Sequence, residues 1–355
     1  MSNSQSRLKG VAAALALVAA VSMGIAGCTA ASPTPQSNGA ASATPAPSIY
    51  CGEECMAQLE LAAAPDSVAC NVGVSWSATS FPYGAVSSQQ IPQHAANWFP
   101  GMSVTVTDGQ GDAAIQSGQV DEMVAQGIDV LIISPRDSDA LAGAVERAVA
   151  AGVKVIAADR NVNTTVDTYI GSDNVEAGVV SGENIAAVLG DGGKLIELAG
   201  SLGASPTIAR ADGLRTGLEG SGVTIVDSQT ADYDQAKGLT VMQDLLQKYP
   251  SGSIDGVYTH NDQMAFGAIQ AIKEAGREGE IQVFSIDGED KALEFVQNGD
   301  MQSTVGYPLV TKESVIAAAK LCSGEPIDER IVLDSTLIDA SNAANFVGKS
   351  PQTGG

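Results

Sequence analysis

Through most of its length the chain alternates short apolar runs with longer stretches in which apolar residues recur every three or four positions. Residues 139–151 show the helical pattern, because Leu141, Val145, Ala148 and Val149 fall on one face of a helix. The short runs predict strands at residues 72–76, 102–107, 128–134, 153–158, 168–171, 194–199, 223–228, 256–260, 281–286 and 302–306. The longer stretches predict helices at residues 113–125, 139–151, 175–189, 207–219, 235–248, 263–275 and 290–297.

This regular alternation of strand and helix predicts an α/β fold. Strands connected through helices pair in parallel, and parallel sheets are covered by helices on both faces. The predicted strands are too many for one small sheet, and they lack the eightfold regularity of a barrel. The pattern therefore predicts two doubly wound lobes, each built on its own parallel sheet.

Three of the predicted strands end on side chains that can hydrogen-bond hydroxyl groups. Asp159 and Arg160 follow one strand, Asn261 follows a second, and Asp287 follows a third. Ligands of open α/β sheets bind at the carboxyl ends of the strands, where such side chains converge. We therefore expect these four residues to line one crevice.

The N-terminus has the features of an export signal. Arg7 and Lys9 precede an apolar run at residues 11–25, which is too short to span a bilayer. The Ile-Ala-Gly-Cys segment at residues 25–28 resembles the lipobox of exported bacterial lipoproteins. The resemblance implies a signal peptide over residues 1–27 and a lipid on Cys28, which would anchor the protein to the cell membrane outside the cytoplasm. The alternative is an ordinary signal peptide followed by an incidental cysteine.

The segment after the lipobox predicts a tether. Residues 29–48 are almost all Ala, Ser, Thr, Pro, Gly, Asn and Gln. That composition buries too little apolar surface to offset chain entropy, so we expect disorder there. Residues 28–69 would thus comprise the disordered tether and a cysteine-containing N-terminal segment.

The net charge of the chain excludes one class of partner. Removing 27 of the 355 residues leaves 328, enough for two domains. The formal charge of −23 becomes −25 when Arg7 and Lys9 are lost with the signal peptide. So acidic a surface repels nucleic acid and offers it no basic footprint.

Four of the five cysteines remain once Cys28 is assigned to the lipid, namely Cys51, Cys55, Cys70 and Cys322. Outside the cytoplasm they can oxidise, and four thiols allow three pairings that the sequence alone cannot separate. We favour Cys51 with Cys55 and Cys70 with Cys322, although cysteines four positions apart bridge only where local helix geometry yields. A metal site is disfavoured, because neither of the two histidines has ligand spacing from the cysteines.

The glycine-rich segments lack the arrangement that catalytic loops need. Residues 190–194 lie between a helix and a strand, the reverse of the order in a phosphate-binding loop. Residues 200–203 follow a strand but lack the Gly-x-Ser-x-Gly spacing of a nucleophile elbow. A Ser-His-acid triad would need His94 or His260, and nothing in the sequence places either beside a nucleophile. We expect a protein that is not an enzyme and carries no cofactor, with a hydrolase as the alternative.

Six short blocks stand in a fixed order along the chain: Leu-Ile-Ile-Ser-Pro-Arg-Asp-Ser-Asp-Ala at residues 131–140, Ala-Asp-Arg at 158–160, Ser-Asp-Asn at 172–174, Ala-Asp-Tyr-Asp at 231–234, His-Asn-Asp-Gln-Met-Ala at 260–265 and Ile-Asp-Gly at 286–288. Together they resemble the type I periplasmic sugar-binding proteins, above all the ribose-binding branch, with xylose-binding proteins as near relatives. The resemblance extends from about residue 72 to residue 334. It implies a receptor without enzymatic activity, whose two lobes are joined by a hinge, close around a sugar and deliver it to an ABC permease.

The resemblance implies a role for each polar residue of the predicted crevice. Asp159 and Arg160 match a pair that contacts sugar hydroxyls, since a carboxylate accepts hydroxyl protons and a guanidinium donates. Arg210, Asn261 and Asp287 match further sugar-binding positions. Each has a structural alternative: a salt bridge for the pair, an exposed helix charge for Arg210, a helix N-cap for Asn261 and a turn for Asp287.

The aromatic positions match the family less closely. Tyr233 corresponds to an aromatic residue that packs on the sugar. Where the family has Asn-Pro-Phe-Phe, this chain has Phe-Pro-Tyr-Gly at residues 81–84, so one ring is missing. Tyr83 retains a ring there, and Trp76 either supplies the lost surface or belongs to the core. Tyr307 stands where ribose binders have Gln, which leaves the identity of the sugar open.

These inferences define the expected organisation of the protein. Residues 70–172 with 308–334 should form the first lobe, and residues 173–307 with 335–348 the second, followed by a tail at 349–355. The expected ligand is a monosaccharide, with an aldopentose such as ribose or xylose as first choice, bound by a monomer that serves an ABC permease. The alternatives are a receptor for a polyol, hexose or signalling furanose that feeds a sensor, and a DNA-bound repressor with the same core. The lipobox and the lack of an N-terminal helix-turn-helix argue against the repressor.

Overall fold

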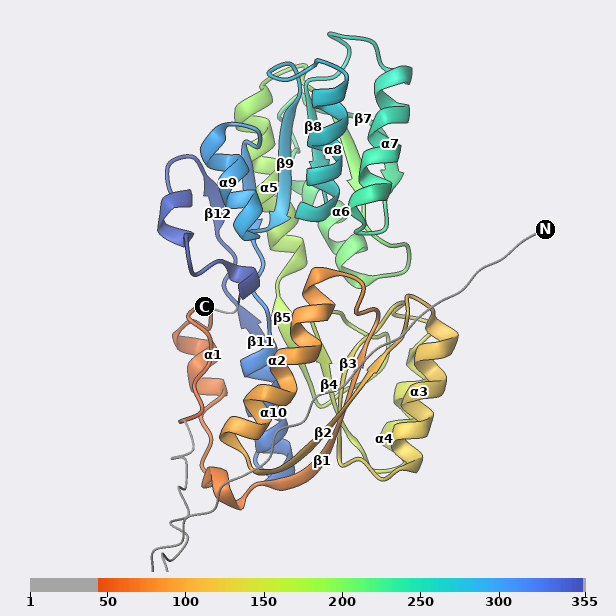
Figure 1. Ribbon diagram of the computed structural model, residues 1–355, viewed down its shortest axis with the longest axis vertical. Coiled ribbons are helices and arrows are strands. Elements are labelled where there is room, and N and C mark those ends of the chain that lie inside the picture. Colours follow the sequence, from red (N-terminus) through yellow and green to blue (C-terminus); the bar gives the residue numbers. More distant parts are fainter. Residues whose placement is uncertain (1–43, 354–355) are drawn as a thin grey trace, which may run out of the picture. The chain divides into compact units, whose positions relative to one another are not determined.

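Two six-stranded sheets organise residues 44–353, the part of the chain that the computed structural model describes (Figure 1). All strands of the first sheet are parallel, and in the second only β12 is antiparallel. The first sheet has the order β11 (Arg330–Leu333), β5 (Thr168–Ser172), β4 (Lys154–Ala158), β3 (Val130–Ser134), β1 (Ala69–Trp76) and β2 (Gly101–Asp108). The second has the order β12 (Leu337–Asp339), β10 (Ser303–Gly306), β9 (Gln282–Asp287), β8 (Gly256–Thr259), β6 (Lys194–Ala199) and β7 (Thr224–Thr230).

The two sheets repeat one topology. Counted from its own first strand, each sheet has the order second, first, third, fourth and fifth, and a strand from the C-terminal part of the chain completes it. This is a doubly wound order, in which the connecting helices cover both faces. The predicted α/β fold with two doubly wound lobes is confirmed.

Each sheet separates two apolar cores. The helices that form them are α2 (Pro82–Trp98), α3 (Ala113–Ala125), α4 (Ala142–Ala150), α5 (Asn174–Leu189), α6 (Ser205–Gly217), α7 (Gln235–Lys248), α8 (Asp262–Glu274), α9 (Asp290–Asn298) and α10 (Thr311–Cys322). In β3, Val130 and Ile132 face the core shared with α2 and α10, while Leu131 and Ile133 face the core shared with α3 and α4. In the second lobe α7, α8 and α9 share one core, and α5 and α6 share the other.

Several elements were not predicted, for identifiable reasons. Helix α2 contains Pro92 and buries Gly84 and Ser87 beside its apolar residues, so its apolar stripe is weak. Helix α10 is buried over almost its whole surface, which removes the amphipathic signal. Strands β11 and β12 have only four and three residues. The expected apolar face of residues 139–151 holds except at Val149, which is 45% exposed.

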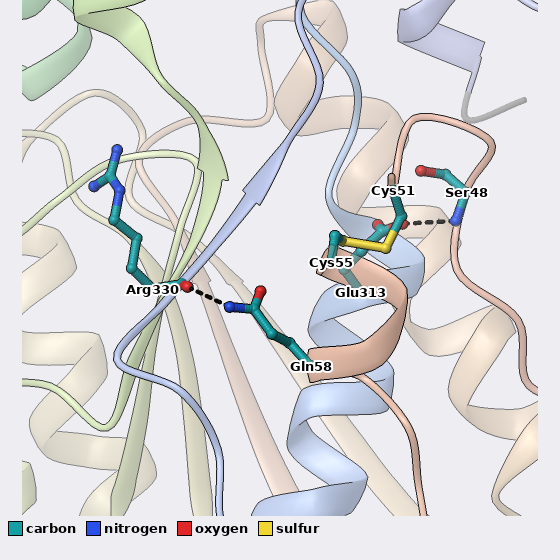
Figure 2. Close-up of a disulfide and its surroundings, with 6 residues drawn as sticks. All are labelled: Ser48, Cys51, Cys55, Gln58, Glu313 and Arg330. Atoms are coloured by element: carbon teal, nitrogen blue, oxygen red, sulfur yellow. Dashed lines mark hydrogen bonds between the residues drawn. A yellow bond between two sulfur atoms is a disulfide. The ribbon is translucent and has the colours of Figure 1, made fainter. Parts of the chain in front are cut away.

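The N-terminal part of the described chain lies along the first lobe. Helix α1 (Glu53–Gln58) packs beside β11 (Figure 1), and Gln58 Nε2 donates to the carbonyl of Arg330 at 3.4 Å (Figure 2). The N–H of Ser48 donates to Glu313 Oε1 at 2.7 Å, and both residues are buried (Figure 2). The prediction of a disordered tether up to residue 48 is therefore wrong at its end, because a bond to a buried carboxylate fixes the chain at Ser48.

Two disulfides join Cys51 to Cys55 and Cys70 to Cys322. Cys51 precedes α1, which begins at Glu53, so the first bridge does not have to fit within a helical turn. The second links β1 to α10 across 252 positions of sequence, a separation at which a cross-link strongly restricts the unfolded chain. This is the pairing that we favoured, and its formation in exported protein stays a prediction.

Three connections join the lobes, from β5 to α5, from β10 to α10 and from β11 to β12. The lobe limits at residues 172–173 and 307–308 stay predictions. Within residues 44–353, no helix combines the length and apolar character needed to cross a membrane. The predicted signal peptide, Cys28 and most of the predicted tether lie outside the described residues.

Candidate functional site

A cavity that is partly open to solvent lies where strands of both sheets reach their carboxyl ends. Its first-lobe wall comes from residues at or after the ends of β1, β3 and β4, and its second-lobe wall from residues at or after the ends of β6, β7, β8 and β9. All nine side chains selected from the sequence line the cavity, namely Trp76, Tyr83, Asp159, Arg160, Arg210, Tyr233, Asn261, Asp287 and Tyr307.

Three of these residues adopt positive φ, which is uncommon for residues other than glycine. The φ angle is +67° at Asp159, +62° at Tyr233 and +139° at Asp287. Such conformations cost on the order of 1–3 kcal/mol each and are concentrated at ligand and catalytic sites. The strain marks the cavity independently of the residue types that line it.

Asp159 is held by donors from its own lobe and from a connection between the lobes. Ser134 Oγ donates to Asp159 Oδ2 at 3.0 Å, and the Tyr307 hydroxyl donates to Oδ1 at 2.9 Å. Arg160 Nε lies 3.6 Å from Oδ2, so the salt-bridge alternative for this pair describes part of its geometry. The carboxylate is thus fixed at the cavity wall while it keeps further acceptor capacity.

Two buried donors at the first-lobe wall lack a hydrogen-bond partner in the described part of the chain. Neither the indole Nε1 of Trp76 nor the Nε of Arg160 has a hydrogen-bond partner within residues 44–353. Trp76 is 2% exposed and belongs to the first-lobe core, and it also lines the cavity, while its contact with a sugar stays a prediction. Buried donors normally find partners, and these two could bond to oxygen atoms in the cavity.

Arg210 forms the centre of the second-lobe wall. It is 3% exposed, so its alternative assignment as an exposed helix charge is wrong. Its Nε donates to Asn174 Oδ1 at 2.8 Å, and its Nη1 donates to the carbonyl of His260. The guanidinium lies 4.5 Å from the ring centroid of Tyr307, and its Nη1 lies 3.8 Å from Asp287 Oδ1.

The carboxyl groups near Asp287 are strongly affected by burial. Burial raises the pKa of Asp287 well above its usual range, against the opposing effect of Arg210. Behind it, burial and the nearby Glu289 raise the pKa of Asp262 to about 7. Asp262 accepts from the N–H of Glu289 at 2.8 Å and from the Thr304 hydroxyl at 2.9 Å. Burial thus favours the protonated form of the carboxyl group at this wall and of the one behind it.

Asn261 lines the cavity and also forms the helix N-cap that was set out as its alternative role, while its contact with a sugar stays a prediction. Its Oδ1 accepts from the N–H of Met264 at 3.0 Å and so caps α8, while its Nδ2 donates to the carbonyl of Tyr233 at 3.3 Å. The Tyr233 hydroxyl lies 2.8 Å from Thr207 Oγ1. A Cβ on Gly200 would lie 2.0 Å from the Tyr233 ring, so this ring position requires glycine there.

Aromatic rings cover the side of the cavity near Tyr83. Its ring centroid lies 6.1 Å from that of Trp76 and 6.0 Å from that of Tyr307. The Tyr83 hydroxyl donates to the carbonyl of Pro308 at 3.3 Å, which ties this ring to a connection between the lobes. The three rings provide flat apolar surface in the same cavity as the polar groups.

The lobes contact each other beside the cavity. The N–H of Ser138 donates to the carbonyl of Gly203 at 3.0 Å, and the N–H of Asn161 donates to Ser205 Oγ at 2.8 Å. Arg160 also lies 5.5 Å from the centroid of the Tyr233 ring in the opposite lobe. These contacts define a closed arrangement of the two lobes.

The sequence analysis missed part of the lining. Phe81, Gln263 and Glu289 line the cavity, and Gln263 Nε2 donates to both carboxylate oxygens of Glu289 at 2.9 and 2.8 Å. Gln263 and Glu289 each stand two residues after a selected position, so the strand-end argument could have included them. Asn174 belongs to the Ser-Asp-Asn block at residues 172–174, but its contact with Arg210 is found only in three dimensions.

The chemistry of the lining favours binding. As described, it contains no histidine or cysteine; its serines are Ser77 and Ser134, and Ser134 donates to Asp159. Residues 44–353 also contain no group of three or more histidine, cysteine, aspartate or glutamate residues that could hold a metal ion. What converges on the cavity is a set of hydrogen-bonding groups and rings.

Comparison with known families identifies the class of protein. A model described as a periplasmic binding protein domain matches residues 72–325. The chain belongs to this family, which is one of binding proteins. The resemblance drawn from the six sequence blocks is therefore confirmed.

Individual relatives agree with this assignment. The ribose import binding protein RbsB of Bacillus subtilis (strain 168) is 36% identical over 263 residues, which cover 73% of this chain and 84% of that protein. An ABC transporter solute binding protein from Mycobacterium smegmatis, solved with bound glycerol, has a TM-score of 0.74 and 33% identity, covering 80% of this chain and 98% of the other. The Caulobacter myo-inositol binding protein, bound to myo-inositol, has a TM-score of 0.72 and 29% identity, with coverages of 78% and 95%.

Proposed function

We propose that this chain is the solute receptor of an ABC importer and binds one neutral monosaccharide in the cavity between its lobes. The observation that carries the proposal is that carboxylate, guanidinium and amide groups from both lobes line the same cavity as several aromatic rings. Carboxylates accept protons from sugar hydroxyls, guanidinium groups donate to hydroxyl oxygens, and rings cover the apolar face of a sugar. In this proposal the sugar is bound and released unchanged.

An aldopentose such as ribose or xylose is the first choice of ligand. The ribose import binding proteins among the relatives support a pentose. The matching positions Asp159, Arg160, Arg210, Asn261 and Asp287 all lie on the cavity wall, as a shared mode of binding requires.

A polyol or hexose is the second candidate. Structural neighbours were solved with glycerol and with myo-inositol. Tyr307 also stands where ribose binders have Gln, and its hydroxyl already bonds to Asp159. A ring at that position reduces the space beside Asp159 and changes which hydroxyl pattern fits.

The proposed setting is the outer face of the cell membrane, with a lipid on Cys28, a monomeric receptor and an ABC permease as partner. The lipobox resemblance supports the anchor, and the charge of −23 argues against nucleic acid as a partner. Substitution Cys28→Ser should release the protein from membranes. Mass spectrometry of an unmodified mature N-terminus would contradict the anchor.

A thermal-shift screen of pentoses, hexoses and polyols tests the binding function. A ligand at about a hundred times its Kd adds about 2.7 kcal/mol of stability, which corresponds to roughly 5–10 °C in Tm for a protein of this size. We expect at least one monosaccharide to give such a shift, and the Asp287→Ala variant to give no more than about half of it at the same concentration. The absence of a shift with every compound would contradict the proposal.

A further inference from the structure

A buried acid and histidine pair lies directly behind the second-lobe wall of the cavity. Glu197 is in the middle of β6 and 1% exposed, and His260, which follows β8, is fully buried. Nε2 of His260 lies 3.0 Å from Oε1 of Glu197. Neither residue lines the cavity, and the proposed function gives neither a role.

The surroundings of Glu197 determine the proton position on His260. Arg215 donates to both oxygens of Glu197, at 3.3 and 3.0 Å, and Ser228 Oγ donates to Oε2 at 2.8 Å. Burial alone would raise the pKa of Glu197, but the donors from His260 and Arg215 outweigh it and hold the pKa at about 2. An ionised carboxylate only accepts, so His260 Nε2 must carry the hydrogen.

The same histidine holds two cavity residues through its backbone. Its carbonyl accepts from Nη1 of Arg210, and its own N–H donates to the carbonyl of Leu198 at 3.0 Å. The next residue is Asn261, whose side chain caps α8 at the cavity. A change in the position of His260 would therefore move the acceptor of Arg210 and the backbone of Asn261 together.

Stability alone does not explain a buried charge at this place. An ion buried in a sheet loses its hydration, and well-packed apolar residues of similar volume are often as stabilising or more so. Arg215, by contrast, is half exposed on its side chain and could pair with a carboxylate at the surface. The pair instead contacts Arg210 through the carbonyl of His260 and directly precedes Asn261.

We propose that Glu197 and His260 are positioning residues for the ligand: the Nε2–H bond fixes the backbone of His260 and thereby sets Arg210 and Asn261 in the geometry that binds the sugar. The proposal rests on the proposed function. It requires a donor at the position of Nε2 and does not require the imidazole ring itself.

This requirement gives a rescue experiment on the full chain. In His260→Leu the donor is lost, whereas in His260→Gln an amide can donate to Glu197 from nearly the same position. We expect calorimetric titration with the sugar selected by the screen to show about tenfold weaker binding for His260→Leu. The His260→Gln variant should stay within about threefold of the unaltered chain.

A matched control is available in the same lobe. Arg277 is 8% exposed and donates to Glu280 at 3.1 Å and to the carbonyl of Tyr249 at 2.8 Å. It follows the far end of α8, about 20 Å along the helix from Asn261. The Arg277→Leu variant should melt at a lower temperature and bind with unchanged affinity. The proposal would be overturned if sugar affinity fell in step with melting temperature across His260→Leu, His260→Gln and Arg277→Leu. It would also be overturned if the two His260 variants bound the sugar equally well.

A second measurement needs no change at residue 260. The chain contains only two histidines, so the imidazole signals of the ¹⁵N-labelled full chain can be assigned with a His94→Gln variant. We expect a neutral His260 ring with hydrogen on Nε2, whose signal shifts when the sugar is added. A ring with hydrogen on Nδ1, or a signal unmoved at saturation, would overturn the positioning role. Failure of the unaltered chain to bind any sugar would overturn the proposed function and this inference with it.

Discussion

The two lobes have the same strand order but form different walls of the cavity. On the first-lobe wall, Trp76 Nε1 and Arg160 Nε are buried donors without a partner in the described part of the chain. On the second-lobe wall, Arg210 and Asn261 are already bonded to neighbouring groups. The same topology thus carries one wall with free hydrogen-bonding capacity and one wall that is ordered in advance.

This difference indicates that the two lobes contribute to ligand binding in different ways. A wall whose groups are already fixed loses little conformational entropy when a ligand arrives. A wall with unpaired buried donors gains hydrogen bonds only when a ligand supplies acceptors. The second lobe would therefore orient the ligand, and the first lobe would gain most from closing on it.

The largest effect is expected from Arg210→Met, which removes the centre of the ordered wall. Asp287 would lose its buried cation, and the bonds to Asn174 and His260 would disappear. We expect sugar binding to weaken by about a hundredfold or more and stability to fall by about 3 kcal/mol. Calorimetry and urea unfolding measure the two effects.

The exposed pair of Arg147 with Asp121 provides the control for that variant. Because its side chains are 54% and 46% exposed, Arg147→Met should leave both stability and binding nearly unchanged. If Arg210→Met and Arg147→Met lost equal amounts of sugar affinity and stability, the buried position of Arg210 would have no special role.

A smaller effect is expected from Gly203→Ala, which acts on closure. Gly203 has a φ of +79°, and a Cβ there would lie 1.8 Å from Asp137 Oδ2 in the opposite lobe. The clash exists only when the lobes are in contact, so affinity should fall by about tenfold. Small-angle scattering should show a larger radius of gyration at saturating sugar than for the unaltered chain. An unchanged radius and affinity would show that this contact does not limit closure.

A loss of about fivefold in affinity is expected from Trp76→Phe, which tests the free donor. The substitution keeps a ring and removes the indole N–H, worth about 1 kcal/mol if the ligand accepts from it. Trp98, which stacks on His94 and does not line the cavity, is the control, and Trp98→Phe should leave affinity unchanged. Equal affinity of both variants would mean that Trp76 contributes only apolar surface.

The smallest expected effect concerns the acidic groups of the ordered wall. Burial and Glu289 raise the pKa of Asp262 to about 7, so the folded protein keeps a proton that the unfolded chain releases near pH 4. Its contribution to stability is present below about pH 4 and is lost as the pH rises toward 7. The Asp262→Asn variant, compared with the unaltered chain by thermal unfolding at several pH values, should therefore gain relative stability across this range. Parallel curves would contradict the raised pKa.

The strand-end argument located the site from sequence because it depends only on where apolar runs stop. Asp159, Asn261 and Asp287 lie at the carboxyl ends of parallel strands, which the fold necessarily brings to one edge. Helix α2 was missed because Pro82 and Pro92 and its buried small residues weaken the helical pattern. The docking of Ser48 on Glu313 depends on a contact between residues 265 positions apart, which no local pattern reveals.

Other parts of the site also depend on three-dimensional contacts. The unpaired state of Trp76 Nε1 and the pairing of Glu197 with His260 follow from packing and not from residue type. The positive φ angles of Asp159 and Tyr233 are held by surrounding contacts against their local preference. The sequence can therefore predict which residues line the cavity. Whether their polar groups have hydrogen-bond partners can be seen only in the structure.

The most direct test of sugar binding by both walls is calorimetric titration of four chains with the sugar from the screen. The unaltered chain should bind one sugar per molecule, and Asp159→Ala and Asp287→Ala should each bind at least about tenfold more weakly, because each leaves ligand hydroxyls without their acceptor. Glu278 is exposed and lies outside the cavity lining, so Glu278→Ala should bind as the unaltered chain does. Full affinity in both aspartate variants, or no heat with any pentose, hexose or polyol, would contradict the account.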